Sequence, residues 1–337
     1  MSSLVLRRGT VTEVERAGPA ARVRVDVGGE LRPAVSYTAL TGLIEPGDDV
    51  LVNCAALDLG LGSGGFDIVH ANLTRGLEAD GARGAHVMKL GYTSLQHTVV
   101  PFEERVAPDE HGSGPVAVIA LHGQLPGVAW AAAQASERPR IGYVQTAGGA
   151  LPGELSDVVR DLRDRGLLAA HVTAGASFGG EHEAITVAGA LEAGFAADGW
   201  DAAIAGPGPG ILGSATRLGH GGLAALDTAH AALALGCRTL LVPRMSDGDP
   251  RERHRGLSHH SATVLELLLA PVFVPLPEGA APPPGEHESA EFAVDLRGYA
   301  RSGLPTTTMG RSLEEDELFF RAALAGGAAL AKEIDGV

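Results

Sequence analysis

The sequence predicts an α/β protein in which a small β-barrel precedes a doubly wound, mostly parallel sheet of about six strands. Three observations support this prediction: short alternating patterns early in the chain, continuous apolar runs separated by helical patterns later, and an aliphatic composition. Hydrophobic residues make up 45% of the 337 residues and aromatic residues only 4%. Such a core of small aliphatic side chains is typical of parallel strands covered by helices.

Residues 1–110 are predicted to form the small barrel domain. Three segments alternate apolar with polar residues, as half-buried strands do: residues 9–14, 22–27 and 49–53. Turn residues such as Gly28 and Gly29 separate these segments. The glycine-rich stretch 60–65 is interpreted as a tight loop between barrel strands.

Residues 111–275 change to a repeating order of strand, loop and helix. Six apolar runs lack in-out alternation, so both faces of each strand should be covered. These runs are Val116–Leu121, Ile141–Val144, Leu167–Val172, Ala202–Ala205, Thr239–Val242 and Val272–Val274. Helical patterns lie between these runs. One helix is predicted to end at Gly166 and has a stripe formed by Leu155, Val158, Val159 and Leu162. Another is predicted to end at Gly236 and has a stripe formed by Leu223, Leu226, His230 and Leu233. The alternation predicts a Rossmann-like domain.

Residues 276–337 are predicted to form a proline-rich linker, a strand and a C-terminal amphipathic helix that packs on the α/β domain. Three successive prolines, residues 282–284, cannot continue a helix. Residues 292–296 resemble a strand, and the sequence from Ser312 to Glu315 is a capping box ahead of an apolar helix face. Thr306–Thr308 could bring hydroxyls from this segment back to the site, but an exposed turn is favoured.

Composition also limits the partners and the location of the protein. A formal net charge of −15 argues against nucleic-acid binding, although the arginines of the first 32 residues keep RNA as a minor alternative. We expect no membrane association, because no apolar run approaches the length of a bilayer span. Cys54 and Cys237 are far apart and lack a paired motif, which predicts a reducing, cytoplasmic location. The alanine-rich segment 224–234 could face the sheet or a second subunit, so a homo-oligomer is possible.

The loops that follow the predicted strands carry the candidate ligand-binding residues. The carboxyl ends of parallel strands meet at one edge of a sheet, where ligands of this fold class bind. Glycines and helix N-termini at this edge favour a small anionic molecule that bears phosphate or carboxylate, and arginines can bind it in a bidentate manner. The candidates are Gly208, Gly210, Ser214, Thr216, Arg217, Arg244 and Ser258.

The segment from Asp249 to His260 concentrates imidazole and guanidinium groups. Ser258 is placed to cap a helix whose first turn would hold His259 and His260, where the helix dipole keeps the rings neutral. Neutral imidazoles can transfer protons or bind a metal. The candidate catalytic residues are His122, His254, His259, His260 and Asp249.

A divalent metal is one interpretation of this segment, and proton transfer and a purely structural cap are the others. The candidate metal ligands are His254, His259, His260 and Asp247, with His122 or His220 as further ligands from other strands. Consecutive helical residues point about 100° apart, so His259 and His260 are not expected to face one centre unaided.

Several common catalytic motifs can be excluded. Residues 208–213 match GxGxxG, but the match follows the fourth strand and Pro209 removes an amide donor, so NAD and FAD are disfavoured. The sequence contains no GxxxxGK[ST] phosphate loop.

Three motifs together resemble a bacterial family catalogued only as a domain of unknown function, DUF3866. They are the His122-Gly-Gln sequence, the run from Gly206 to Arg217 and the run from Asp249 to His260. The resemblance extends over nearly the whole chain, and it implies no established activity.

Two functions from different classes remain. The first is an enzyme, with a hydrolase as the expected class, that acts on a small anionic substrate at the carboxyl edge of the sheet with metal assistance or histidine acid/base catalysis. The second is a non-catalytic module that binds or senses a metabolite.

Overall fold

The computed structural model describes residues 4–60, 64–77, 81–134, 138–214 and 216–336. The contacts divide the chain into two compact units, Met1–Val99 and Val100–Val337. The glycine-rich stretch that was predicted as a barrel loop includes residues 61–63, which lie outside the described residues. The two units are considered separately below.

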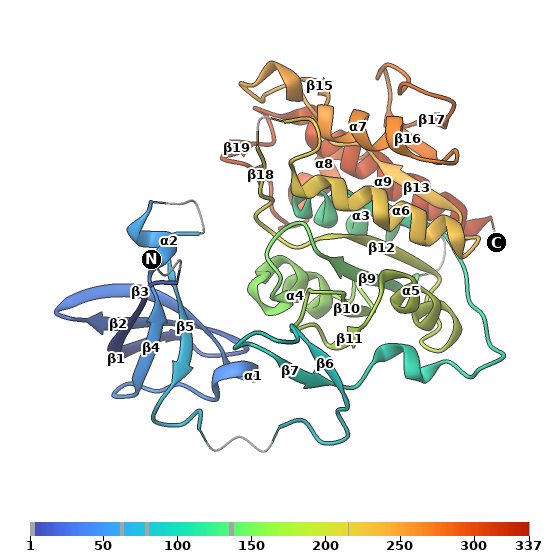
Figure 1. Ribbon diagram of the computed structural model, residues 1–337. Helices are drawn as coiled ribbons and strands as arrows, with labels where there is room; N and C mark the ends of the chain where they lie inside the picture. Colours follow the sequence, from blue (N-terminus) through green and yellow to red (C-terminus); the bar gives the residue numbers. More distant parts are fainter. Residues whose placement is uncertain (1–3, 61–63, 78–80, 135–137, 215, 337) are drawn as a thin grey trace. The chain divides into compact units, whose positions relative to one another are not determined.

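The first unit contains a closed five-stranded barrel with the order β1-β2-β3-β5-β4, and β4 pairs with β1 to close it (Figure 1). Val23, Val25, Val50 and Val52 fill its interior, because strand residues two apart point to the same side. The predicted small barrel is therefore confirmed. Its elements are β1 (Leu6–Arg16), β2 (Ala20–Val27), β3 (Glu30–Tyr37), α1 (Thr38–Thr41), β4 (Asp49–Asn53), α2 (Ala55–Asp58) and β5 (Asp67–Asn72), followed by the hairpin of β6 (Val87–Lys89) and β7 (His97–Val99).

The second unit is built on an eight-stranded sheet in which every pair of neighbouring strands is parallel. All six predicted strands belong to it, and β11 and β17 extend its two edges. The order is β11-β10-β9-β12-β8-β13-β16-β17. The strands are β8 (Val116–Ile119), β9 (Ile141–Thr146), β10 (Ala170–Ala174), β11 (His182–Ala184), β12 (Ala202–Pro207), β13 (Thr239–Val242), β16 (Phe273–Pro277) and β17 (Glu288–Phe292).

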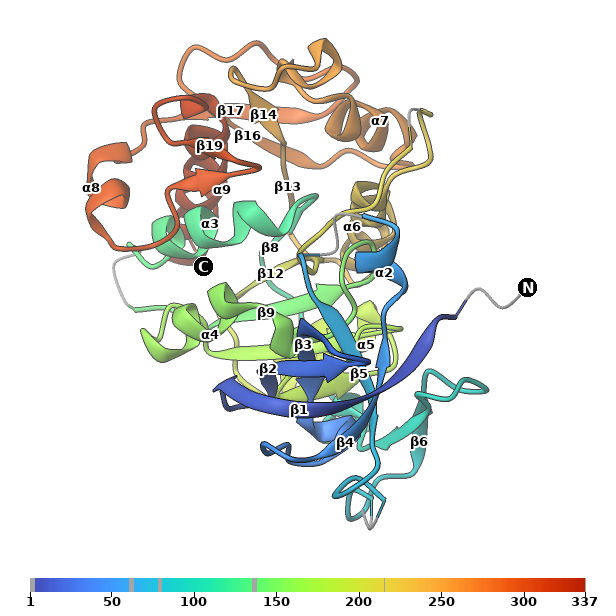
Figure 2. The same cartoon turned by 90° about the vertical axis from the view of Figure 1, so that its left-hand side faces the viewer.

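Helices cover both faces of the sheet, as Figure 2 shows. One core joins Val116 and Val118 of β8 to α5 (Val187–Ala196), α6 (Ala224–Ala234) and α7 (His259–Leu267). The other core joins Ala117 and Ile119 to α3 (Leu125–Ala132), α4 (Asp157–Asp164), α8 (Leu296–Arg301) and α9 (Glu317–Asp335). The unit is thus a three-layer α/β structure. None of its described helices, nor any in the described part of the first unit, has the length and apolar character needed to cross a membrane.

Short elements complete the second unit and shape its loops. They are η1 (Phe102–Arg105), η2 (His122–Gln124), η3 (Gly153–Leu155), η4 (Gly221–Leu223), β14 (Met245–Ser246), η5 (Glu252–His254), β15 (Gly256–Leu257), β18 (Thr307–Thr308) and β19 (Arg311–Ser312).

Two local predictions for the C-terminal segment were wrong in position. Strand β17 begins at Glu288, four residues earlier than predicted, and Leu296 begins α8 instead. Ser312 and Glu315 do form the reciprocal hydrogen bonds of a capping box, at 2.8 and 3.3 Å. However, this box closes a turn, and α9 begins only at Glu317, after Asp316.

The burial of α6 also differs from the prediction. The small residues Ala225, Ala229 and Ala232 are completely buried against the sheet, whereas Leu226 and Leu233 on the predicted stripe are only half-buried. Small side chains let a helix approach a sheet closely, so the alanine face rather than the leucine face carries the packing. The alanine face is therefore not free to bind a second subunit.

Candidate functional site

A cavity of about 620 Å³ lies beyond the carboxyl ends of β8, β12 and β13. Loops that are far apart in the sequence contribute its walls, as expected at this edge of a parallel sheet. Its lining residues are Leu121–Gly123, Pro209–Ser214, Arg244, Arg251, Arg253, His254, His260 and Thr307–Met309.

Gln124 joins the loops that follow β8 and β13. Its side-chain amide donates hydrogen bonds to the carbonyls of Val242 and Pro243, both at 3.2 Å. Its Oε1 accepts from the backbone N–H groups of Ala120 and Leu121 at 3.2 and 3.1 Å. Because Gln124 is buried and uses both ends of its amide, it holds the two loops at a fixed separation.

His122 lies at the floor of the cavity in a fully hydrogen-bonded position. Its Nε2 is 2.7 Å from Ser156 Oγ, and its Nδ1 is 3.3 Å from Tyr143 Oη. Ser156 in turn caps α4 by accepting from Val159 N at 3.1 Å. Burial lowers the pKa of His122 to about 4, so the ring is neutral near pH 7.

Arg244 supplies a buried positive charge on the wall of the cavity. Its side chain is fixed by Asp249, whose Oδ2 accepts from Nη2 at 3.1 Å. Arg251 binds the same carboxylate, and its hydrogen bonds hold the pKa of Asp249 well below the usual range. Burial lowers the pKa of Arg244 to about 10, so the guanidinium is still charged near neutral pH.

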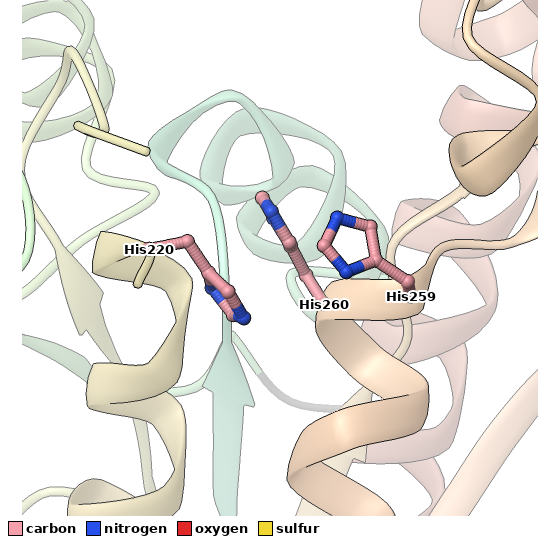
Figure 3. Close-up of side chains that lie close together, drawn as sticks. All are labelled: His220, His259 and His260. Atoms are coloured by element: carbon pink, nitrogen blue, oxygen red, sulfur yellow. The ribbon is translucent and has the colours of Figure 1, made fainter. Parts of the chain in front are cut away.

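Four histidines meet beside this arginine, and we call His220, His254, His259 and His260 the histidine cluster. The rings of His220 and His260 stack with centroids 3.8 Å apart and an interplanar angle of 12°. His259 lies 4.4 Å from His260 and 5.6 Å from His220, and His254 lies 4.8 Å from His259. Figure 3 shows His220 in the segment before α6 and the other two labelled rings at the start of α7.

Ser258 builds this arrangement locally. It caps α7, as predicted, by accepting a hydrogen bond from the backbone N–H of His260 at 3.3 Å. Its Oγ also lies 2.7 Å from Nδ1 of His254, which fixes that ring beside the helix. One hydroxyl therefore sets both the start of the helix and the position of His254.

Burial lowers the pKa of every ring in the histidine cluster, and Arg244 adds to the effect in each case. The pKa falls to about 4 for His254 and to about 2 for His260. It is also lowered for His220 and His259. All four imidazoles are consequently neutral near pH 7, which leaves a nitrogen lone pair on each.

Part of the predicted site lies around the cavity. His122, Gly210, Ser214, Arg244, His254 and His260 line it. Ser258 and Asp249 are completely buried behind this lining, where they position His254 and Arg244. His259 belongs to the histidine cluster.

Four further predicted site residues do not line the cavity. A side chain at Gly208 would meet the carbonyl of Ala150, so this glycine serves the packing of two loops. Thr216 is exposed and bonds to Ser214 Oγ, and Arg217 pairs with Glu266 at 2.6 Å. Asp247 is exposed and accepts from the N–H of Leu318 at 3.3 Å, which places it at the start of α9.

The structure adds residues that the sequence did not single out, and it places Thr308 at the cavity, which was the less favoured alternative for that segment. Tyr143 and Ser156 hold His122, and neither belongs to a recognisable motif. Thr308 and Met309 line the cavity from a hairpin that was expected to be an exposed turn. Thr308 is only 7% exposed, because β18 and β19 return this segment to the sheet edge.

Comparisons with known proteins give a family but no activity. A search of curated proteins finds no match. Among solved structures, YjeQ from Thermotoga maritima aligns at 15% identity and a TM-score of 0.15, over 50% of this chain and 51% of YjeQ. A likeness at that level carries no argument, and the alignment spans only about half of YjeQ. A family model matches residues 33–327, so the chain belongs to the family of proteins of unknown function DUF3866.

Proposed function

We propose that this protein is an enzyme, a hydrolase, that acts on a small anionic substrate bearing phosphate or carboxylate in the cavity lined by Arg244. Three cavity arginines, Arg244, Arg251 and Arg253, support the proposal. A guanidinium can offer two parallel N–H donors to an oxyanion, and a partly enclosed site strengthens that contact.

One observation carries this proposal. The Nε of Arg244 is buried and has no hydrogen-bond partner among the residues that the structure describes. Leaving a buried charged donor unsatisfied costs about 1–3 kcal/mol or more, so such groups usually have a partner. An oxyanion in the cavity that Arg244 lines would supply the missing acceptor.

The neutral imidazoles supply the chemistry that hydrolysis needs. Of the two histidines that line the cavity beside Arg244, His254 has the less strongly lowered pKa and is the better base. A neutral imidazole can accept a proton from the attacking water and return it to the leaving group. The arginines would then stabilise the negative charge that develops on the substrate.

We further propose that the second unit is Rossmann-like and that the protein acts in the cytoplasm on small molecules rather than on nucleic acid or membranes. Helices on both faces of a parallel sheet support the first point, although the strand order differs from 3-2-1-4-5-6. Cys54 and Cys237 are free and buried, which supports a reducing compartment. The net charge of −15 disfavours polyanionic partners.

Thermal unfolding with inorganic phosphate and with citrate tests the proposal. We expect at least one anion to raise Tm of the wild type, and Arg253→Gln to reduce the shift, because Arg253 lines the cavity and is exposed. Arg297→Gln is the matched control, since Arg297 is exposed on α8 and outside the cavity. Absence of any anion-dependent shift would overturn the site. An anion shift without turnover of phosphate and carboxylate esters would favour a sensor instead.

A further inference from the structure

We propose that His220, His259 and His260 bind a divalent transition-metal ion, with Zn²⁺ as the preferred ion, beside the anion cavity. The metal site stands on its own contacts, and its use in catalysis rests on the proposed function. Three histidines with an open fourth position are the ligand set of a catalytic zinc site, in which the ion activates a bound water.

The distances fit such a site after a small adjustment. One nitrogen from each of the three rings lies within 4.8 Å of the others. Zinc to nitrogen bonds of about 2.0–2.1 Å place tetrahedral ligand atoms about 3.4 Å apart. The nitrogens must therefore move together by about 1.5 Å at most, which side-chain rotation can supply.

Unsatisfied nitrogen atoms point to a missing partner. Both ring nitrogens of His220 and the Nε2 of His259 are buried without a hydrogen-bond partner among the described residues. A buried polar atom without a partner is unfavourable by about 1–3 kcal/mol, so three such atoms in one cluster need an explanation. A metal ion bound by one nitrogen of His220 and by the Nε2 of His259 accounts for two of these atoms, and the other nitrogen of His220 carries the proton of the neutral ring and interacts with the Arg217 backbone.

The helix geometry no longer opposes a shared centre. The ring of His260 stacks on His220, and the ring of His259 lies across both of them at 63° and 72°. His220 comes from a different loop, so it meets the two α7 residues from outside the helix. Because the lone pair of an imidazole nitrogen lies in the ring plane, the stacked rings of His220 and His260 must turn out of their parallel arrangement before both can face one ion.

Space and ligand type favour a small, imidazole-preferring ion. A Cβ at Gly222 would lie 3.3 Å from Nδ1 of His220 and 3.5 Å from Nδ1 of His260, so the glycine keeps this side of the rings open. The ligand set contains no carboxylate, and imidazole nitrogen suits zinc, copper and nickel far better than Mg²⁺ or Ca²⁺.

Arg244 would have to respond to the ion. Its Nη1 is 3.3 Å from Nδ1 of His260. A metal ion at this ring would repel the guanidinium and compete with it for the nitrogen lone pair. Asp249 binds Nη2 of the same guanidinium, so Arg244 retains an anionic partner when it moves from the ring. Metal binding would thereby free one guanidinium N–H for an anion in the cavity, which links the two sites.

Equilibrium dialysis of the untagged full chain against Zn²⁺, followed by elemental analysis, tests the site. We expect one Zn²⁺ per chain. His220→Gln, His259→Gln and His260→Gln should each weaken binding by about 100-fold or more, since loss of a ligand exceeds the effect of losing a residue that orients one. His230→Gln is the matched control, because His230 lies on α6 and accepts a hydrogen bond from Leu269 N.

Either of two outcomes would overturn the inference. One is that the wild type holds no stoichiometric Zn²⁺, and the other is that the His220→Gln variant binds Zn²⁺ as tightly as His230→Gln does. Circular dichroism of each metal-free variant shows whether it has folded. If His220→Gln fails to fold, Co²⁺ in the wild type decides instead, because a tri-histidine site gives intense visible absorption of four- or five-coordinate Co²⁺ and an octahedral surface ion does not.

Failure of the metal site and failure of the proposed function give different results. If Zn²⁺ does not bind but phosphate or citrate still raises Tm, only the metal inference is wrong. If Zn²⁺ binds and no anion changes Tm or the Co²⁺ spectrum, the metal site stands and the anionic substrate is wrong. A Co²⁺ spectrum that changes on addition of phosphate supports both.

Discussion

Arg244 and Asp249 form a 3.1 Å ion pair in which the arginine is 2% exposed and the aspartate is completely buried. Asp249 also accepts from Arg251 at 2.9 Å and lies 3.7 Å from Arg311. One carboxylate therefore balances several guanidiniums at the wall of the cavity. Its removal would leave the buried Arg244 guanidinium without its anionic partner and beside other positive charges.

We accordingly predict that Asp249→Ala lowers the free energy of unfolding by about 3–5 kcal/mol, the usual effect of removing one member of a buried ion pair. Denaturant unfolding followed by circular dichroism measures it. Glu252→Ala is the control, because Glu252 is exposed three residues away and should change stability by less than about 0.5 kcal/mol. Equal effects of the two substitutions would contradict the role of Asp249.

Ser258→Ala should destabilise the protein by about 1 kcal/mol or more. The substitution removes the N-cap of α7 and the hydroxyl that lies 2.7 Å from His254 Nδ1. Ser289→Ala, at an exposed position on β17, should have almost no effect. Thermal unfolding compares the two variants, and a Ser258→Ala variant as stable as the control would disprove the double role of this hydroxyl.

His122 should make the protein less stable as the pH falls from 6.5 to about 4. The folded-state pKa of about 4 lies below the ordinary 6.5, so in this range only the unfolded chain takes up the proton. The loss amounts to about 3 kcal/mol at the low end. His171, whose pKa burial lowers to about 3, acts in the same direction.

Denaturant unfolding at pH 7 and pH 4.5 measures this dependence. His122→Gln should reduce the difference between the two pH values by about 2 kcal/mol, because glutamine does not titrate. An unchanged difference would show that His122 is not buried in its neutral form.

Glu154 should have the opposite pH dependence. Burial, with help from Glu183, raises its pKa to about 7, and its Oε2 has no hydrogen-bond partner among the described residues. The folded state therefore binds this proton more tightly than the unfolded chain, and stability contributed by the neutral carboxyl is lost as the pH rises through 7.

We therefore expect Glu154→Gln to be more stable than the wild type at pH 8.5, with the gain shrinking toward pH 5. Urea unfolding at both pH values tests this, with Glu286→Gln at an exposed position as the control. A gain that is the same at both pH values would contradict the prediction.

The strand pattern was predictable from the sequence because buried parallel strands leave uninterrupted apolar runs, and all six such runs belong to the sheet. Strand β11 was missed because its three residues, His182–Ala184, are polar or small and only Ala184 is buried. Within this strand Glu183 pairs with Thr173 of β10, and the next helix, α5, begins only at Val187. At the sheet edge, tertiary pairing overrides local preference.

The location of the cavity could be anticipated from topology, since carboxyl ends of parallel strands share an edge. The residues that line the cavity could not be predicted in the same way. Arg217 and Asp247 belong to the same loops as Gly210 and Arg244, yet one pairs with Glu266 on the surface and the other accepts from Leu318. Such differences depend on side-chain direction within a loop, which no spacing pattern specifies. His220 became central only because its ring stacks on His260.

The helix α9 delays completion of the second unit's core during synthesis. Its residues 317–335 cover β13 and β16, and Gly326 contacts Val242 of β13 while Gly327 approaches Val128 of α3. While the ribosome is still translating this helix, β13 and β16 lack the part of the apolar core that α9 provides. The nascent α/β unit must therefore remain open, and accessible to chaperones, until that helix has left the exit tunnel.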